Sequence, residues 1–368
     1  GTYNISGILV GNYTATCTAT GYNPASAGIT IVVGQTTTQD FAMTAPTMNI
    51  TPAAINVIVD PFGTATELVN INNNGNGGLD WDASLELLTE SGKDPWDLQF
   101  NFDVTAASGA AGNAGAECDG QYYYSTRWAS NLIHKYDLTG ALIEEFSIPG
   151  VTGLRDLAFD GTYMYGGAAA NTVYQMDFVN KTLVSTIASP QPVRSIAYDE
   201  GQGGFWVANW ATDIVLINMS GGTITSIPAA THGLAGIYGT AYDNWSAGGP
   251  FLWIFDQGAG AGMPQILYQA DLNSITMTGF THDVTADLPP NTSAIAGGLF
   301  TIPNVYPGTV SLGGLIQGTP DVLFMYELAP FATWITIAPG SGSVPAGGNG
   351  QMTVNFDAGD IPAGTVKT

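Results

Sequence analysis

The stretch AECDGQYYY at Ala116–Tyr124 is the first of four copies of one phrase: a short apolar strand, an Asp-led turn and an aromatic-rich strand. The other copies read LAFDGTYMY at Leu157–Tyr165, IAYDEGQGGFWVA at Ile196–Ala208 and TAYDNWSAGGPFLWIF at Thr240–Phe255. Their turn aspartates, spaced by about forty residues, are Asp119, Asp160, Asp199 and Asp243. A period of that size, built from strands and turns, predicts the four-stranded blades of a β-propeller.

Extending the phrase in both directions divides the middle of the chain into five blades. We place them at Gly115–Gly150, Leu154–Pro190, Val193–Ala229, Ile237–Asp287 and Ser293–Leu328. The fifth has only three strands, and we expect DLQFNFDV at Asp97–Val104 to supply its outer strand, which closes the ring and removes exposed edges. Six blades remain the alternative, if residues 97–115 or the long fourth blade contain another.

Composition agrees with an all-β chain and excludes some partners. Among 368 residues there are 48 Gly and 20 Pro, and only 10% are charged. Such a chain is rich in turns and strands. No apolar run approaches the roughly 18 residues of a membrane span, so we expect no membrane insertion. The net charge of −23 offers no basic footprint for a phosphate backbone, so we expect no nucleic-acid partner. Cys17 and Cys118 are expected to be free buried thiols, with a disulfide as the alternative.

The segments that flank the repeats resemble two families of sandwich domain. GTYNISGILVGNYT, TATGY and GQTTTQDFAM, within residues 1–46, resemble the second half of a carboxypeptidase-regulatory-like, transthyretin-type sandwich. The I-x-P start, the G-T-A turn, ELVNINNNGNGGL and LDW, within residues 47–88, resemble the opening half of an immunoglobulin-like repeat of large secreted bacterial proteins. The matching second half occurs only at Ala332–Thr368, as ATWITIAPGSGSVPAGGNGQMTVNFDAGDIPAGTVKT.

This order predicts a domain insertion. The expected domains are a partial transthyretin-like sandwich at 1–46, an immunoglobulin-like sandwich split into 47–92 and 331–368 with its last strand missing, and a propeller at 93–330. Two separate immunoglobulin-like domains are the alternative, although about 40 residues is short for an independent core. The repeats are similar to NHL- and YVTN-type propellers. Together these resemblances imply a modular, secreted or surface-attached bacterial protein, located extracellularly or at the cell surface.

Strand direction assigns polar residues to the two faces of the propeller. The four turn aspartates share one face with Asp137, Asp177, Asn218 and Asp271. We expect these side chains to bond nearby backbone N–H groups and so stabilise turns. A ring of Ca²⁺ sites is the alternative, but no D-x-D-x-D-G loop is present, and we expect no cofactor.

The opposite face collects every arginine of the chain. The candidate ligand-binding residues there are Arg127, Trp128, Arg155, Arg194, Asn209, Trp210 and Tyr238. Arginine gives bidentate hydrogen bonds to oxyanions, and tryptophan offers a flat apolar surface that also stacks on arginine. The structural alternative is that the arginines form ion pairs with carboxylates such as Asp156, Asp213 or Asp256.

The sequence gives little sign of catalysis. Propeller glycosidases use two carboxylates across a central pocket, for which Glu117 and Asp156 are the candidates. No third inward carboxylate accompanies them, the three histidines are scattered, and no G-x-S-x-G elbow occurs. We therefore expect no enzyme, with a glycosidase or lyase as an alternative.

The predicted function is a non-catalytic extracellular binding or adhesion module whose Arg/Trp face engages a glycan or a protein. A structural spacer or fibre subunit is the alternative. In that case neighbouring copies would associate by strand addition at open sandwich edges.

Overall fold

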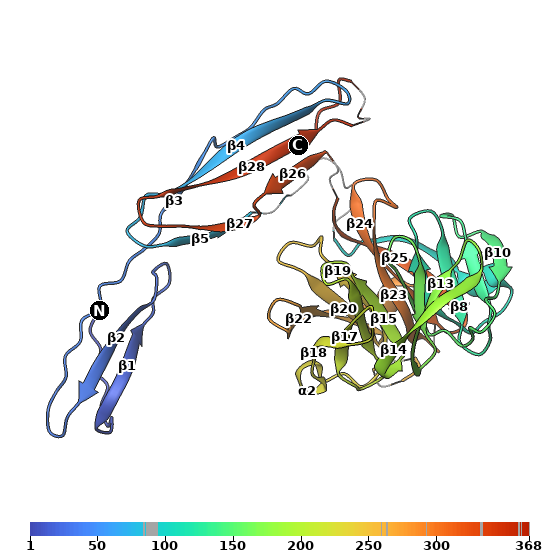
Figure 1. Ribbon diagram of the computed structural model, residues 1–368, viewed down its shortest axis with the longest axis horizontal. Coiled ribbons are helices and arrows are strands. Elements are labelled where there is room, and N and C mark those ends of the chain that lie inside the picture. Colours follow the sequence, from blue (N-terminus) through green and yellow to red (C-terminus); the bar gives the residue numbers. More distant parts are fainter. Residues whose placement is uncertain are drawn as a thin grey trace. The chain divides into compact units, whose positions relative to one another are not determined.

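The computed structural model describes residues 1–83, 85, 95–258, 260–262, 264–291, 293–331, 334–359, 361 and 363–367. The chain forms two compact units: unit 1 comprises Gly1–Glu86 and Ala332–Lys367, and unit 2 comprises Leu87–Phe331. Both units are built mainly from strands, and the described residues of unit 2 also form three short helices (Figure 1). None of the helices in the described part is long and apolar enough to cross a membrane.

Unit 2 contains five four-stranded antiparallel sheets. In chain order the first four sheets are β7 (Asn113–Cys118) to β10 (Leu142–Phe146), β11 (Asp156–Phe159) to β14 (Thr182–Val193), β15 (Ser195–Asp199) to β18 (Thr223–Ile227), and β19 (Ile237–Asp243) to β22 (Thr276–Asp283). Their middle strands are β8 (Tyr123–Arg127), β9 (Ile133–Tyr136), β12 (Met164–Gly167), β13 (Ala170–Asp177), β16 (Gly204–Ala208), β17 (Ile214–Asn218), β20 (Phe251–Asp256) and β21 (Ile266–Asp271). The helices are α1 (Val104–Ser108), α2 (Ala229–His232) and α3 (Val284–Asp287).

The fifth sheet joins the two ends of unit 2. It consists of β23 (Ile295–Pro303), β24 (Thr309–Gln317), β25 (Val322–Pro330) and, on the outside, β6 (Leu98–Asp103). The pairing of β6 with β25 confirms that the segment Asp97–Val104 supplies the outer strand of the last repeat. The first strand of each sheet contacts the first strand of the next, and β23 contacts β7. This closed arrangement of four-stranded sheets is compatible with a propeller-like fold (Figure 1).

The turn aspartates of the repeats act as predicted, and they also anchor aromatic side chains. Asp119 accepts hydrogen bonds from the backbone N–H groups of Gln121 and Tyr122 through one oxygen and from the Tyr124 hydroxyl through the other. The same aspartate-to-aromatic bond links Asp160 to Tyr165, Asp199 to Trp206 and Asp243 to Trp253. Each aspartate therefore fixes the turn and also ties it to the second strand of its own sheet.

The core of unit 2 lies between adjacent sheets. Trp206, Ile214 and Leu216 of the third sheet pack with Leu252 and Ile254 of the fourth in one buried cluster. Alternation along each strand sends side chains to both faces of its sheet, so both faces of the inner strands are buried and apolar. This explains why the repeated strands are short apolar runs.

A single carboxylate joins the inner strands at the centre of this ring. Asp156, which is 0% exposed, accepts hydrogen bonds from four backbone N–H groups. The donors are Leu157 at 3.0 Å, Ile196 at 3.1 Å, Thr240 at 3.3 Å and Leu299 at 3.3 Å, one from each of β11, β15, β19 and β23. The first three donors each lie three residues before a turn aspartate, so the repeat places equivalent amides around one point.

Small residues make room for this carboxylate. Gly115, Ser195 and Gly239 occupy the positions that correspond to Asp156 in the other copies of the repeat. A Cβ added at Gly298 would lie 2.5 Å from Asp156 Oδ1, and one added at Gly239 would lie 2.5 Å from the carbonyl oxygen of Gly297. The ring therefore accommodates one large side chain at this level.

Unit 1 joins segments from both ends of the chain. One sheet has the order β26 (Ile335–Ala338), β28 (Asn349–Asp357), β4 (Thr64–Asn73) and β3 (Met48–Thr51). The strands β27 (Ser341–Val344) and β5 (Leu79–Asp82) form a second sheet, and β1 (Gly11–Cys17) and β2 (Ala25–Ile31) form a third. The β4–β28 and β5–β27 pairs unite the two halves in which we found the immunoglobulin-like resemblance. The predicted boundary between residues 92 and 93 lies outside the described residues.

Asn73 organises the turn of the NNNGNGG motif. Its side chain is buried, donates to the carbonyl oxygens of Gly77, Val344 and Pro345, and accepts from the backbone N–H groups of Thr47 and Gly75. A Cβ at Gly75 would lie 2.3 Å from the carbonyl oxygen of Ala45, so glycine is required by this close approach.

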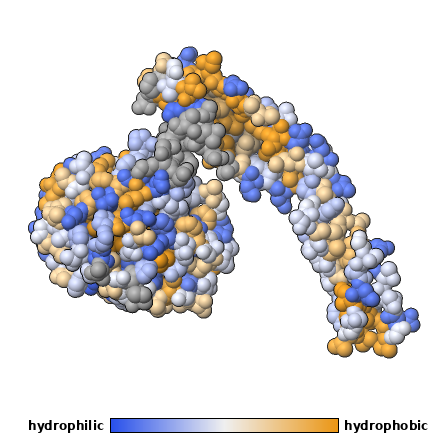
Figure 2. Space-filling model, turned by 180° about the vertical axis from the view of Figure 1, so that it is seen from behind, coloured by the Kyte–Doolittle hydropathy of each residue, from blue (hydrophilic) through white to orange (hydrophobic). Residues whose placement is uncertain are grey.

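Several large apolar side chains are exposed on the surface of unit 1. Leu9, Val10, Val32 and Val33 are exposed at the end of the hairpin where β1 begins and β2 ends, since Gly11 pairs with Ile31. Figure 2 shows hydrophobic residues on the surface of unit 1, both at this hairpin and on the larger sheet region. Cys17 and Cys118 are both free; Cys118 is buried as expected, whereas Cys17 is only half-buried beside Met43.

Candidate functional site

Six of the seven residues proposed from the sequence lie together in unit 2. We call this set the Arg/Trp cluster; it comprises Trp128, Arg155, Arg194, Asn209, Trp210 and Tyr238. Trp128 and Trp210 follow the second strands of the first and third sheets, whereas Arg155 and Arg194 immediately precede β11 and β15. Tyr238 lies near the start of β19. The cluster therefore combines residues from four consecutive sheets.

Backbone hydrogen bonds fix both arginines to the sheets. The N–H group of Arg155 donates to Gly167 at 2.8 Å, and that of Arg194 donates to Ala208 at 2.9 Å. These bonds extend the β11–β12 and β15–β16 ladders by one residue. The guanidinium groups are thus carried by rigid strand ends and not by free loops.

Each arginine stacks on an exposed indole. The guanidinium carbon of Arg155 lies 5.0 Å from the ring centre of Trp128, and that of Arg194 lies 3.9 Å from the ring centre of Trp210. Trp128 is 43% exposed and Trp210 is 37% exposed, whereas Arg194 is only 8% exposed. Each such stack contributes about 0.5–1 kcal/mol at an exposed site and about 2 kcal/mol or more when desolvated.

The turn that carries Trp210 is held in a strained conformation. Trp210 has a φ of 53°, in the left-handed region that a bulky residue rarely adopts. Asn209 and Thr212 close the turn, because Asn209 N–H donates to the Thr212 hydroxyl and Thr212 N–H donates to the Asn209 carbonyl. Asn209 Oδ1 also accepts from Arg194 Nε at 3.0 Å. The strain places the indole directly over the Arg194 guanidinium.

Tyr238 connects the two stacked pairs. Its ring lies 5.3 Å from the Arg194 guanidinium carbon and 6.2 Å, edge to face, from the ring of Trp210. Its hydroxyl is close enough to Arg155 for that guanidinium to lower the tyrosine pKa, although burial dominates and raises the pKa overall. Burial also lowers the pKa of Arg194, and the positive charge of Arg155 acts in the same direction.

The arginines have no carboxylate partners within the described part of the chain. No Asp or Glu oxygen there lies within 4.0 Å of Arg127, Arg155 or Arg194. The structural alternative, in which they pair with Asp156, Asp213 or Asp256, is therefore wrong. Those carboxylates instead accept backbone N–H groups: Asp156 at the centre of the ring, Asp213 from Ala229, and Asp256 from Gly236 and Gly258.

Arg127 does not join the cluster. Its Nη2 atom donates to the carbonyl oxygen of Ser108, the last residue of α1, at 3.1 Å and to that of Ala110, two residues further on, at 3.2 Å. A cation in this position interacts favourably with the helix C-terminus and ties β8 to the segment between α1 and β7. The sequence analysis placed Arg127 on the same face as the Arg/Trp cluster, but its side chain bonds to these carbonyl groups instead.

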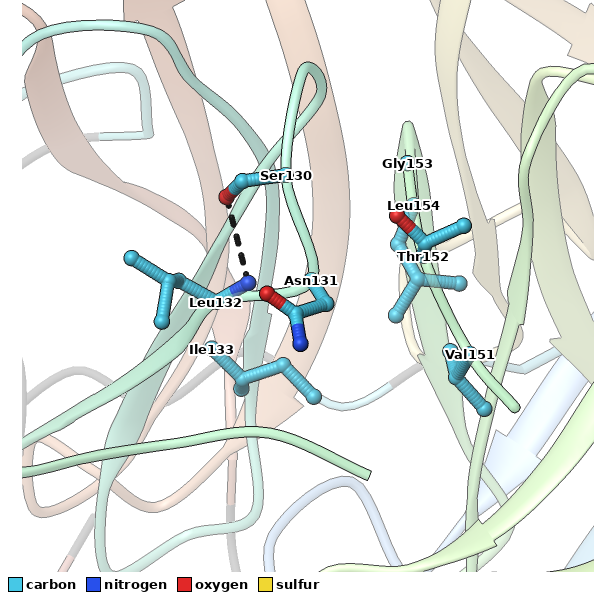
Figure 3. A pocket seen from close by; sticks show the side chains of 8 residues that line it. All are labelled: Ser130, Asn131, Leu132, Ile133, Val151, Thr152, Gly153 and Leu154. Carbon is cyan, nitrogen blue, oxygen red and sulfur yellow. Dashed lines mark hydrogen bonds between the residues drawn. The ribbon is translucent and has the colours of Figure 1, made fainter. Parts of the chain in front are cut away.

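A shallow depression lies beside the Trp128 half of the cluster. It is lined by Ser130, Asn131, Leu132 and Ile133 on one side and by Val151, Thr152, Gly153 and Leu154 on the other (Figure 3). Gly153 N–H donates to the Ser130 carbonyl at 2.7 Å, which holds the two segments together. Asn131 and Thr152 were not singled out from the sequence, because only the fold brings their turns face to face.

The axial carboxylates do not form an accessible acid–base pair. Glu117 and Asp156 are 5% and 0% exposed, and burial raises the pKa of each well above its ordinary value. Hydrogen bonds from backbone N–H groups oppose this effect at both residues. The two carboxylates considered from the sequence are therefore both buried in this structure. No group of three or more His, Cys, Asp or Glu residues that could hold a metal ion occurs among the described residues.

Two solved structures are similar to parts of this chain. No family model matches the chain, and no curated protein matches it. Among solved structures, the glutaminyl cyclase of Myxococcus xanthus matches 65% of this chain and 100% of its own length, with 12% identity and a TM-score of 0.48. The hydrazine synthase of Kuenenia stuttgartiensis matches 55% of this chain and 56% of its own, with 14% identity and a TM-score of 0.37.

One expectation from the sequence is contradicted by these matches. We expected no enzyme, but the solved structure that is matched over its whole length is a glutaminyl cyclase, which is an enzyme. The exclusion of catalysis is therefore withdrawn. Likeness at this level transfers neither a substrate nor the role of any residue to this chain.

Proposed function

We propose that unit 2 is a five-bladed β-propeller that binds a ligand or partner through the Arg/Trp cluster. The five four-stranded sheets, the contact between β23 and β7, and the pairing of β6 with β25 support the blade count. The proposal concerns binding, and it holds whether or not the bound molecule is then converted.

One observation carries this proposal: two exposed indoles each cover a guanidinium group that has no carboxylate partner among the described residues. Large aromatic side chains and arginine are the residues most enriched among those that dominate binding energy. A cluster that served only to hold sheets together would be expected to direct its cations at internal acceptors, as Arg127 does through Nη2, which donates to two carbonyl groups. The strained backbone at Trp210 is a further mark of a functional position.

Around this platform we propose the modular arrangement suggested by the sequence. The propeller interrupts an immunoglobulin-like sandwich, preceded by a transthyretin-like module, in a secreted or surface-attached protein that adheres to a glycan or protein. The pairing of β4 with β28 and of β5 with β27 supports the interruption, because it unites halves separated by the whole of unit 2.

The test compares the parent protein with a variant that carries Arg155→Gln, Arg194→Gln and Trp210→Ala. Retention on a glycan array and on immobilised extracellular-matrix proteins is measured for both. We expect at least one ligand of the parent to be lost by the variant, whose circular dichroism and thermal transition must remain those of a folded protein. Equal retention by both proteins, or no retention of the parent on either surface, would contradict the proposal.

A second candidate function, self-association by strand addition, is favoured by the surface of unit 1. The β1–β2 sheet has only two strands, and Leu9, Val10, Val32 and Val33 are exposed at one end of it. An isolated two-stranded sheet is marginal in water, and a free edge can pair with another chain. Sedimentation velocity over a hundredfold concentration range tests this: concentration-dependent assembly is expected, and a constant monomer would refute it.

A further inference from the structure

The charges around the Arg/Trp cluster indicate the class of ligand. Arg155 and Arg194 lie close enough for the charge of one to lower the pKa of the other, yet both lack a carboxylate partner among the described residues. Two like charges held together in a half-buried site favour an anion placed between them. Arginine is suited to carboxylates and related oxyanions, because its planar donors match their geometry.

Buried hydrogen-bond donors without acceptors also favour an oxyanion as the ligand. Arg155 Nε and the Tyr238 hydroxyl are buried and have no acceptor with full hydrogen-bond geometry in the described structure. Buried donors without acceptors are uncommon and call for an explanation. The Arg194 guanidinium donates through Nε to Asn209 Oδ1, and the Tyr238 hydroxyl lies within reach of the same guanidinium. An oxyanion that reached Arg155 and Arg194 together would relieve these deficits.

The remaining surface of the cluster is flat and aromatic. Trp128 and Trp210 expose substantial parts of their rings, and the depression beside Trp128 is shallow and carries the polar side chains of Ser130, Asn131 and Thr152 (Figure 3). A flat apolar plane beside hydrogen-bonding groups fits a ring that has one apolar face and several hydroxyls. It does not enclose a ligand as a deep pocket would.

The charge of the whole protein limits how acidic the ligand can be. A net charge of −23 repels polyanions at long range, so two arginines cannot offset many negative charges. A ligand with one negative charge suffers little from this repulsion and gains the full local interaction.

We propose that the Arg/Trp cluster binds a sugar ring that carries a single carboxylate, as a uronate does. The carboxylate lies between Arg155 and Arg194, within reach of the Tyr238 hydroxyl, and the ring lies against an exposed indole. This inference rests on the proposed binding function and adds the ligand class to it.

Two disaccharides that differ by one group test the inference. Cellobiouronate carries one carboxylate, and cellobiose is its neutral counterpart. Calorimetric titration of the full chain should give an affinity for cellobiouronate at least about tenfold higher than for cellobiose, since a charge-assisted hydrogen-bonded pair contributes that much or more. Sodium acetate and triglutamate serve as an isolated oxyanion and an acidic peptide, and both should bind more weakly than cellobiouronate.

Variants assign the preference to named side chains. Arg155→Gln or Arg194→Gln should lower the affinity for cellobiouronate about tenfold, so that it no longer exceeds the affinity for cellobiose. Trp128→Ala should lower the affinity for both disaccharides. The control is Lys135→Gln, because Lys135 lies 3.6 Å from the ring centre of Tyr122 and thus forms a cation–aromatic pair outside the cluster. This control should bind as the parent does.

The outcomes separate the inference from the proposed function. Equal affinity for the two disaccharides, no binding of cellobiouronate, or tighter binding of triglutamate would overturn the uronate proposal. If the triple variant of the Arg/Trp cluster loses an array ligand of another class, the proposed binding function stands and only the uronate proposal fails. If the binding of no ligand depends on the cluster, both proposals fail.

Discussion

Replacing Asp156 should loosen the centre of unit 2 and leave unit 1 intact. The carboxylate is fully buried and accepts four backbone N–H groups from four different inner strands. Asp156→Ala would leave all four donors without an acceptor. Each unsatisfied buried donor costs about 1–3 kcal/mol.

The four costs do not add in full. A water molecule can enter the vacated space and satisfy some of the donors. We therefore take the loss in unfolding free energy as roughly 3–5 kcal/mol, the range found when one partner of a buried charged interaction is removed. For a unit of this size that corresponds to a fall in Tm of about 10 °C.

Differential scanning calorimetry can follow the two units separately. The transition of unit 2 should shift, and that of unit 1 should serve as an internal reference within the same sample. Asp213→Ala is the matched control, because the Asp213 side chain accepts a single backbone N–H, from Ala229, at the surface. That variant should lose no more than about 1 kcal/mol, as for a helix N-cap.

Anion rescue gives a sharper test of the same reasoning. Asp156→Gly leaves a cavity lined by backbone N–H groups, which should accept formate. Sodium formate should raise the Tm of unit 2 in Asp156→Gly more than sodium chloride does at equal ionic strength. In the parent protein the two salts should have the same effect on this Tm. The role assigned to Asp156 would be refuted if Asp156→Ala lowered the Tm no more than the Asp213→Ala control does. It would also be refuted if formate and chloride had the same effect on the Tm of Asp156→Gly.

Three further predictions address other parts of the molecule. Asn73→Ala should lower the stability of unit 1 by roughly 2–4 kcal/mol without moving the transition of unit 2, because its side chain bonds to five backbone groups; an unchanged unit 1 transition in calorimetry would contradict this. Burial lowers the pKa of His134 and His232 below 6.5, so the stability that they contribute is present above that pH and is lost as the pH falls. Urea unfolding between pH 7.5 and 5.5 should therefore show a slope of up to about 1.4 kcal/mol per pH unit for each, and the double glutamine variant should flatten it; an unaltered slope would show that other groups are responsible. Trp210→Gly should be more stable than Trp210→Ala by about 1 kcal/mol, since glycine tolerates the positive φ, and the reverse order in chemical denaturation would rule out strain at this residue.

The repeated phrase was sufficient to predict most of unit 2. Its aspartate register located the turns, and its strand order predicted that Asp97–Val104 would pair with the last strand, as β6 does with β25. Local chemistry determines both features: a turn aspartate bonds its own neighbours, and a missing strand in one repeat must come from elsewhere in a closed ring.

Long-range contacts could not be predicted in the same way. Asp156 was considered as a catalytic candidate and as an ion-pair partner of the arginines, because nothing in its own segment shows that amides from three other repeats converge on it. The sequence placed Arg127 with the cluster, but its side chain bonds to two carbonyl groups at and after the end of α1. That Arg155 and Arg194 have no carboxylate partner in the described part of the chain also depends on side-chain directions, which the sequence does not specify.

The most direct test of the Arg/Trp cluster is an NMR titration of ¹⁵N-labelled indole groups with cellobiouronate. Trp128 and Trp210 expose their rings, whereas the indoles of Trp206 and Trp253 are buried and bonded to Asp199 and Asp243, so they report on indirect effects in the same sample. We expect the signals of Trp128 and Trp210 to shift in a saturable way, and those of Trp206 and Trp253 to stay in place. Saturable shifts confined to other tryptophans, or no shift at all for Trp128 and Trp210, would contradict the account.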